Sequence, residues 1–83
     1  MNSYLINEKM ILREEDKMVF SAHDMKIYKF NEKGFKVVKL IHDNKQISRK
    51  KLFSLLDKDY TNEEIDNLIT KMKNNNIIIE YEE

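Results

Sequence analysis

In the stretch Ile27-Tyr28-Lys29-Phe30-Asn31-Glu32-Lys33-Gly34-Phe35, the hydrophobic pattern of this chain changes from that of strands to that of helices. Before it, apolar residues come in short pieces separated by polar groups, which is typical of antiparallel strands. After it, apolar residues recur at spacings of three and four, which indicates amphipathic helices. Asn31 is a good N-cap residue, and Phe30 and Phe35 flank it as a hydrophobic staple. The first helix is therefore predicted to begin just after Asn31.

The segment before this point predicts three main strands. Polar groups separate them, and Asp24 offers a tight turn before the third. Two further apolar pieces, one near each end of the chain, are possible extra strands. The predicted main strands are residues 10–12, 18–20 and 25–30, and the possible ones are 4–6 and 77–81.

The segment after this point predicts three helices. Ser48 is expected to cap the second helix, and Thr61 with Glu64 forms a capping box for the third. The run 74–76 is three asparagines, which suit the end of the third helix because asparagine tolerates the left-handed conformation. The expected fold class is thus α+β and winged-helix-like, with a three-stranded antiparallel sheet followed by three helices.

Length and composition bound the function. The 83 residues suit one small domain over 1–83 with its core at about 10–80, and 15 basic residues balance 15 acidic ones. The longest apolar runs are three residues, whereas a membrane-spanning helix needs about 20. The chain has no cysteine, which suits a reducing compartment. We therefore expect a cytoplasmic protein that does not interact with membranes.

The chain lacks the usual signatures of catalysis. It has one glycine, so it contains no phosphate-binding loop or dinucleotide fingerprint. His23 and His42 are isolated, without a second ligand at metal-binding spacing, and no serine lies in a nucleophile elbow. We expect a non-catalytic binding module with no metal site and no cofactor.

The residues 27–35 quoted above resemble the aromatic-x-Leu-Asn-x-x-Gly segment of PqqD-like proteins, the RiPP recognition elements. Residues 40–44 resemble the leucine-rich Asp-Gly turn that follows it, 47–56 the short second helix, 58–60 the tyrosine-containing link, and 65–79 the closing helix. Phe30 stands where leucine is usual. Asn44 and Asn76 stand where the family has turn glycines, so a positive φ is expected at both.

The resemblance implies a winged-helix-like domain that binds the leader of a ribosomally made precursor peptide. Such domains present the leader to a separate modifying enzyme, for example a radical SAM enzyme, a cyclodehydratase or a leader peptidase. The leader adds as a strand to the third strand and packs against the third helix. Carried over by position, the implied peptide-binding residues are Met25, Lys26, Ile27, Tyr28, Lys29, Ile65, Leu68, Ile69, Met72 and Lys73.

Each of these residues also has a plainer explanation. Ile65, Leu68 and Ile69 suit a helix core, Met72 suits a core or an adaptable groove, and Tyr28 shares a strand face with Phe30. The lysines at 26 and 29 could equally be charges that protect a strand edge from aggregation. An exposed edge also allows pairing with a second copy, so a monomer or a weak homodimer is expected.

The charge distribution leaves two other functions open. Residues 26–58 contain ten basic and three acidic side chains, and the rest contains five basic and twelve acidic ones. This basic segment suits an acidic partner protein, or DNA if the chain is a small winged-helix regulator. Nucleic acid is the less favoured partner, because Glu63, Glu64 and Asp66 open the third helix and would repel phosphates. A structural adaptor whose groove is filled by its own C-terminal segment is the third possibility.

Overall fold

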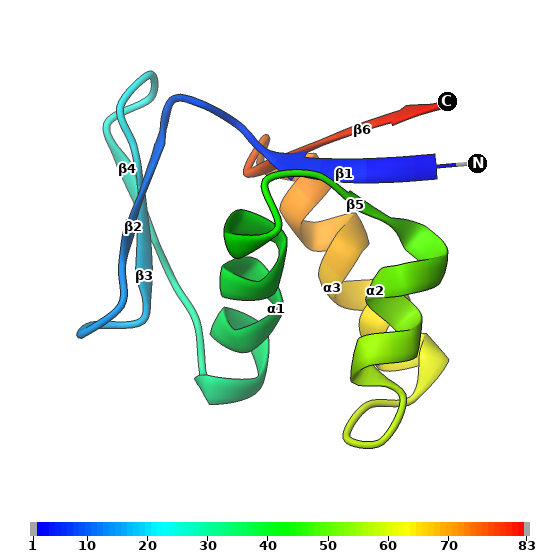
Figure 1. Ribbon diagram of the computed structural model, residues 1–83. Helices are drawn as coiled ribbons and strands as arrows, with labels where there is room; N and C mark the ends of the chain where they lie inside the picture. Colours follow the sequence, from blue (N-terminus) through cyan, green and yellow to red (C-terminus); the bar gives the residue numbers. More distant parts are fainter. Residues whose placement is uncertain (1, 83) are drawn as a thin grey trace.

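The computed structural model describes residues 2–82 and shows an α+β fold with two antiparallel three-stranded sheets and three helices (Figure 1). The elements follow in the order β1 (Asn2–Ile6), β2 (Met10–Arg13), β3 (Met18–Ser21), β4 (Lys26–Lys29), α1 (Glu32–Asp43), β5 (Ile47–Ser48), α2 (Arg49–Leu56), α3 (Asn62–Asn74) and β6 (Ile78–Glu82). None of the helices in this part of the chain is both long and apolar enough to cross a membrane.

The first sheet, here called the meander sheet, joins β2, β3 and β4 in that order. Phe20 at its centre pairs with Ile11 on β2 and with Ile27 on β4. The three predicted main strands are therefore confirmed to within about two residues. Met25 is the exception, because it lies in the turn before β4 with a left-handed φ of 58°. Its N–H donates to the Ser21 carbonyl oxygen at 2.8 Å, which closes the hairpin before the strand begins.

The second sheet, here called the terminal sheet, joins β5, β1 and β6. Both possible end strands are present, but they pair with each other, Tyr4 opposite Glu80 and Leu5 opposite Ile79. The prediction of one sheet followed by three helices is therefore incomplete. A pairing between residues so distant in sequence leaves no local pattern, whereas the strands of a hairpin lie close together in the chain.

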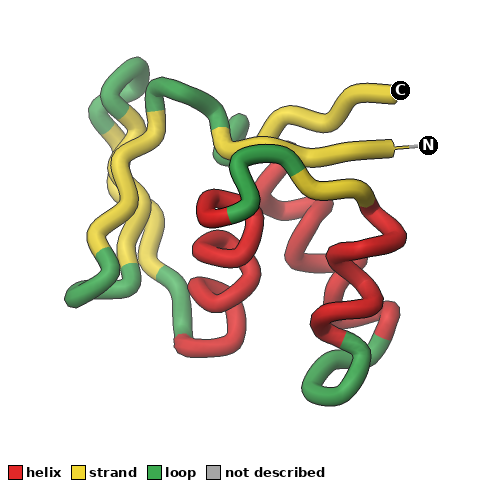
Figure 2. The backbone as a smooth tube through the Cα atoms, viewed as in Figure 1, coloured by secondary structure: helices red, strands yellow, loops and turns green. Residues whose placement is uncertain are grey.

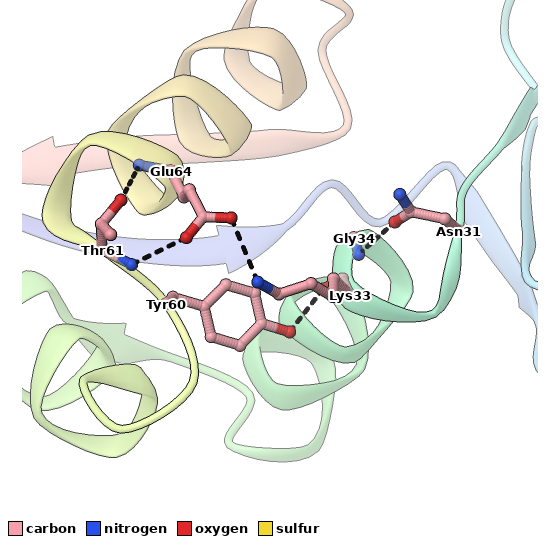
Figure 3. A network of polar contacts seen from close by, with 6 residues as sticks. All are labelled: Asn31, Lys33, Gly34, Tyr60, Thr61 and Glu64. Carbon is pink, nitrogen blue, oxygen red and sulfur yellow. Dashed lines mark hydrogen bonds and ion pairs between the residues drawn. The ribbon is translucent and has the colours of Figure 1, made fainter.

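The three predicted helix starts are confirmed. The Asn31 side chain accepts a hydrogen bond from the Gly34 N–H at 2.8 Å. Ser48 Oγ accepts from the Lys51 N–H at 3.2 Å. Thr61 and Glu64 form the complete capping box, with each side chain accepting from the other residue's backbone N–H (Figure 3). Each cap satisfies N–H groups that the first turn of a helix leaves without partners.

The two asparagines expected at positive φ behave differently. α3 ends at Asn74, and Asn76 has a φ of 59°, as predicted. Asn44 has a φ of −85°, and the left-handed position falls on Lys45 at 62°. The Asn44 side chain instead donates to the Leu40 carbonyl oxygen at 2.8 Å, so its role is to cap the end of α1.

Helix α1 lies between the meander sheet on one side and α2 and α3 on the other (Figures 1 and 2). Its Val37, Val38 and Ile41 are fully buried in the core. Polar contacts reinforce its position against α3: the Tyr60 hydroxyl donates to the Lys33 carbonyl oxygen at 2.7 Å, and Lys33 Nζ lies 3.1 Å from Glu64 Oε2 (Figure 3).

We predict that Thr61→Ala lowers the free energy of unfolding by about 1 kcal/mol, because it removes the side chain that caps α3. Urea unfolding followed by circular dichroism measures the loss. Thr70→Ala is the matched control, since Thr70 is exposed inside the same helix and alanine is the better helix former there. Equal effects of the two substitutions would contradict the capping role.

Candidate functional site

Strand β4 forms one edge of the meander sheet and pairs only with β3. Within residues 2–82 no strand pairs with its other side. Such an edge presents unpaired N–H and C=O groups that can accept a further strand. The predicted binding strand is thus an edge strand, which is the first requirement for strand addition.

The hydrogen-bond pattern shows which backbone groups of β4 face outward. The Phe30 N–H donates to the Lys17 carbonyl oxygen at 3.0 Å, which makes that pair a hydrogen-bonded one. Hydrogen-bonded and non-bonded pairs alternate along an antiparallel ladder. Lys26 and Tyr28 therefore bond to β3, whereas the N–H and C=O groups of Ile27 and Lys29 point toward the free edge.

The opposite edge of the meander sheet, on β2, is less available. The Ala22 N–H donates to the Lys9 carbonyl oxygen at 2.9 Å, and the same alternation directs the backbone groups of Met10 and Leu12 outward. The Met10 N–H already donates to the Asn7 carbonyl oxygen at 2.9 Å. An added strand would therefore find fewer free groups on β2 than on β4.

The outer face of the meander sheet is apolar at its centre. Ile11, Phe20 and Ile27 form a row across the three strands, and the isoleucines at its ends are 53% and 59% exposed. These three residues line a shallow hollow together with Arg13 and Met18. Only Ile27 was predicted as a binding residue. The signal for Ile11, Met18 and Phe20 is the pair of unbroken apolar runs 10–12 and 18–20, because an apolar residue at every position of a strand makes both faces apolar.

The residues predicted on α3 lie elsewhere. Ile65, Ile69 and Met72 are buried in the core, and Leu68 is half-buried against it. Lys73 is ion-paired with Glu80 on β6. Because α1 separates α3 from the meander sheet, the structure does not bring this helix and β4 together as the two sides of one groove (Figure 1). Ile65, Ile69 and Met72 therefore match the core interpretation, and Leu68 packs against the same core.

Tyr28 lies where its strand face predicts. It is half-buried and packs against the core, as Phe30 does. The neighbouring Lys26, Ile27 and Lys29 are exposed. Of the β4 residues, these three are therefore open to a partner through their side chains.

Folding offsets part of the charge of the basic segment, which has ten basic residues. Four of its cations form ion pairs with acidic residues from outside 26–58: Lys33 with Glu64, Lys36 with Asp59, Lys39 with Glu14 and Arg49 with Asp66. Less than half of the basic residues are thus matched by acidic neighbours in space. Lys26 and Lys29 have no ion pair with any residue that the structure describes.

A polar cluster connects the terminal sheet with α2 and α3. Arg49 donates to the Tyr4 hydroxyl at 3.0 Å and is ion-paired with Asp66. Burial raises the pKa of Tyr4, while the hydrogen bond from Lys73 lowers the pKa of Glu80. No group of three His, Asp or Glu side chains in the described chain is arranged to hold a metal ion.

We predict that Met72→Ala and Ile27→Ala, at two positions predicted from sequence to bind peptide, differ sharply in stability. The first leaves a cavity at a fully buried side chain and costs about 2–5 kcal/mol. The second removes a side chain that is 59% exposed and changes stability by about 0.5 kcal/mol or less. Urea unfolding of both variants measures this contrast, and similar losses would show that the outer face is not a solvent-exposed surface.

A second prediction concerns pH. Because the folded-state pKa of Glu80 is lowered, its contribution to stability is present above its unfolded-state pKa and is lost as pH falls through the folded value. The urea midpoint should therefore fall on acidification below about pH 4.3, the usual glutamate value. Glu80→Gln should reduce this acid-dependent loss, and an unchanged pH profile in that variant would contradict the assignment.

Comparison with known proteins assigns no family to this chain. No family model matches it, and no curated protein or solved structure matches it either. The resemblance to PqqD-like proteins therefore stays a prediction that rests on the residues quoted from the sequence.

Proposed function

We propose that this protein is a non-catalytic carrier that binds the leader of a ribosomally synthesised precursor peptide by strand addition to β4. The observation that carries the proposal is the free edge at which Ile27 and Lys29 direct their backbone groups away from β3. The resemblance to PqqD-like proteins supplies the class of ligand. In this proposal the meander sheet and the three helices form the winged-helix-like unit, and the terminal sheet is an addition to it.

Strand addition gives the peptide two kinds of contact. Backbone hydrogen bonds to Ile27 and Lys29 supply affinity that does not depend on the peptide sequence. Side chains of the added strand alternate between the two faces, so every second one lies beside Ile27 and the apolar outer face. The groove against α3 plays no part in this version of the site, because α3 packs on the far side of α1.

The other partners follow from the same role. Presentation of a leader requires a separate modifying enzyme or leader peptidase, and the cytoplasm is where a precursor leaves the ribosome. Pairing of β4 with a second copy is disfavoured, because it would gather the two lysines of each copy along one seam. We therefore propose a monomer, or at most a weak homodimer.

DNA binding is the alternative function that the experiment must distinguish from leader binding. The exposed start of α3 carries Glu63 and Glu64, and Arg49 at the start of α2 is paired with Asp66. Both features weaken attraction to phosphates, although Lys50 and Lys51 on α2 remain exposed. A winged-helix regulator would bind through these helices and would lose affinity steeply as salt rises.

We predict that Ile27→Pro abolishes leader binding and spares the fold. Proline removes an N–H that faces the free edge, and it is tolerated on edge strands when that group is not part of the ladder. Tyr28→Pro is the matched control. It removes an N–H that bonds to β3, so it should lower the unfolding midpoint.

The measurement is an NMR titration of the ¹⁵N-labelled protein with the leader of a short peptide encoded beside its gene, and with a random DNA duplex, each at two salt concentrations. Leader-induced shifts on residues 26–29 that change little with salt, and that are absent in Ile27→Pro, support the proposal. Normal leader binding by a folded Ile27→Pro would overturn the β4 site. Shifts confined to 33–58 with DNA, lost at high salt, would instead indicate a DNA-binding protein.

A further inference from the structure

The side chains of β4 indicate what kind of peptide would add to it. Resting on the function proposed above, we infer that the preferred strand carries an acidic residue at each end of a four-residue segment, with an apolar residue opposite Ile27. The inference rests on two free cations, one exposed apolar side chain and the register of the strand. Each of these is independent of the resemblance to any family.

The first observation is the unmatched positive charge. Lys26 and Lys29 are exposed at the two ends of β4, and none of the residues from 2 to 82 forms an ion pair with either. The meander-sheet strands contain no Asp or Glu. Of the nearest acidic side chains along the chain, Glu32 pairs with Lys17 at 3.3 Å, and Asp24 lies 3.9 Å from His23, with which it pairs only when the histidine is protonated. The two lysines are thus available to a complementary charge on an added strand.

The second observation is the interrupted apolar row. Ile11, Phe20 and Ile27 continue from strand to strand, and the row ends at β4 with more than half of the Ile27 side chain exposed. Directly opposite residues of neighbouring strands have Cβ atoms about 4.5–5.5 Å apart. An apolar residue opposite Ile27 would extend the row by one strand and remove apolar surface from water.

The pairing of an added strand with β4 determines which peptide sequence fits these observations. An added strand places one residue opposite each of Lys26, Ile27, Tyr28 and Lys29, and the first and last of these face opposite sides of the sheet. The outer positions favour Glu or Asp. The inner positions favour apolar residues, because Tyr28 packs against the core and Ile27 belongs to the apolar row. The resulting peptide pattern is acidic-apolar-apolar-acidic. Because this pattern is symmetric, it is the same whether the peptide adds parallel or antiparallel to β4.

Lys26 and Lys29 also disfavour the addition of other kinds of strand to the edge of β4. A basic strand would set like charges directly opposite each other, which is destabilising. A second copy of β4 would bring two further lysines to the same seam, which also disfavours self-association. The two lysines thus both protect the edge from self-association and select an acidic strand, so the protective and the functional interpretations of these residues are compatible.

The test uses the full chain and three short peptides with identical Ser/Gly flanks. Their central segments are Glu-Ile-Val-Glu, the composition-matched Ile-Glu-Glu-Val, and Lys-Ile-Val-Lys. NMR titration at low salt should show the first peptide shifting residues 26–29 and binding about tenfold or more tightly than the third, since two cross-strand charge pairs change sign. The matched peptide should also bind more weakly, because its acidic residues lie opposite Ile27 and Tyr28. Added salt should reduce the difference between the first and third peptides.

The charge-reversed variant Lys26→Glu/Lys29→Glu provides the decisive control. It should invert the preference and bind Lys-Ile-Val-Lys most tightly, a result that a merely structural role for the lysines would not produce. Equal binding of the three peptides at β4 would leave strand addition standing and overturn the inference. Failure of Glu-Ile-Val-Glu to bind at millimolar concentration would overturn it as well, even if the natural leader binds at β4. If the leader also fails to shift 26–29, the proposed function fails with it.

Discussion

Helix α1 lies between the meander sheet on one side and α2 and α3 on the other, and the rest of the molecule depends on this arrangement (Figure 1). Val37, Val38 and Ile41 are fully buried, and apolar side chains from both sheets and from α2 and α3 belong to the same core cluster. Because α1 fills the centre, α3 is kept apart from the meander sheet (Figure 1). That separation decides the form of the candidate site: in the proposed function, the peptide binds at a strand edge and a sheet face and not in a groove beside α3.

The edge and the outer face together have the properties of a recognition surface. In the proposed function, the backbone of β4 attaches the peptide, and two exposed lysines and an exposed isoleucine select its sequence. Ion pairs elsewhere offset half of the other cations of the basic segment: Lys33, Lys36, Lys39 and Arg49 all have acidic neighbours. The lysines of β4 thus differ from the paired cations of α1 in being available to an acidic partner.

Local patterns in the sequence were sufficient for the three helices and the three main strands, and insufficient for β5 and for the assembly of the elements. The caps at Asn31, Ser48 and Thr61 and the left-handed Asn76 follow from the chemistry of single residues and their near neighbours. The pairing of β1 with β6 does not, because it depends on contacts between opposite ends of the chain. The candidate site was likewise predicted only in part. The edge strand was predicted, but whether Met72 faces a groove or the core is decided by where α1 lies.

The terminal sheet has a consequence for how this molecule tolerates attachments. Asn2 pairs with Glu82, so both ends of the described chain leave the same end of one sheet, while the meander sheet lies on the far side of α1 (Figure 1). Cargo joined to either end, whether a fluorophore, a surface tether or an enzyme, would therefore occupy the same region of space. A short linker between the two ends would make a circular permutant possible. The chain would then be opened at an exposed turn such as 57–59, between α2 and α3. The new termini would lie at the end of these helices that is away from the terminal sheet (Figure 1).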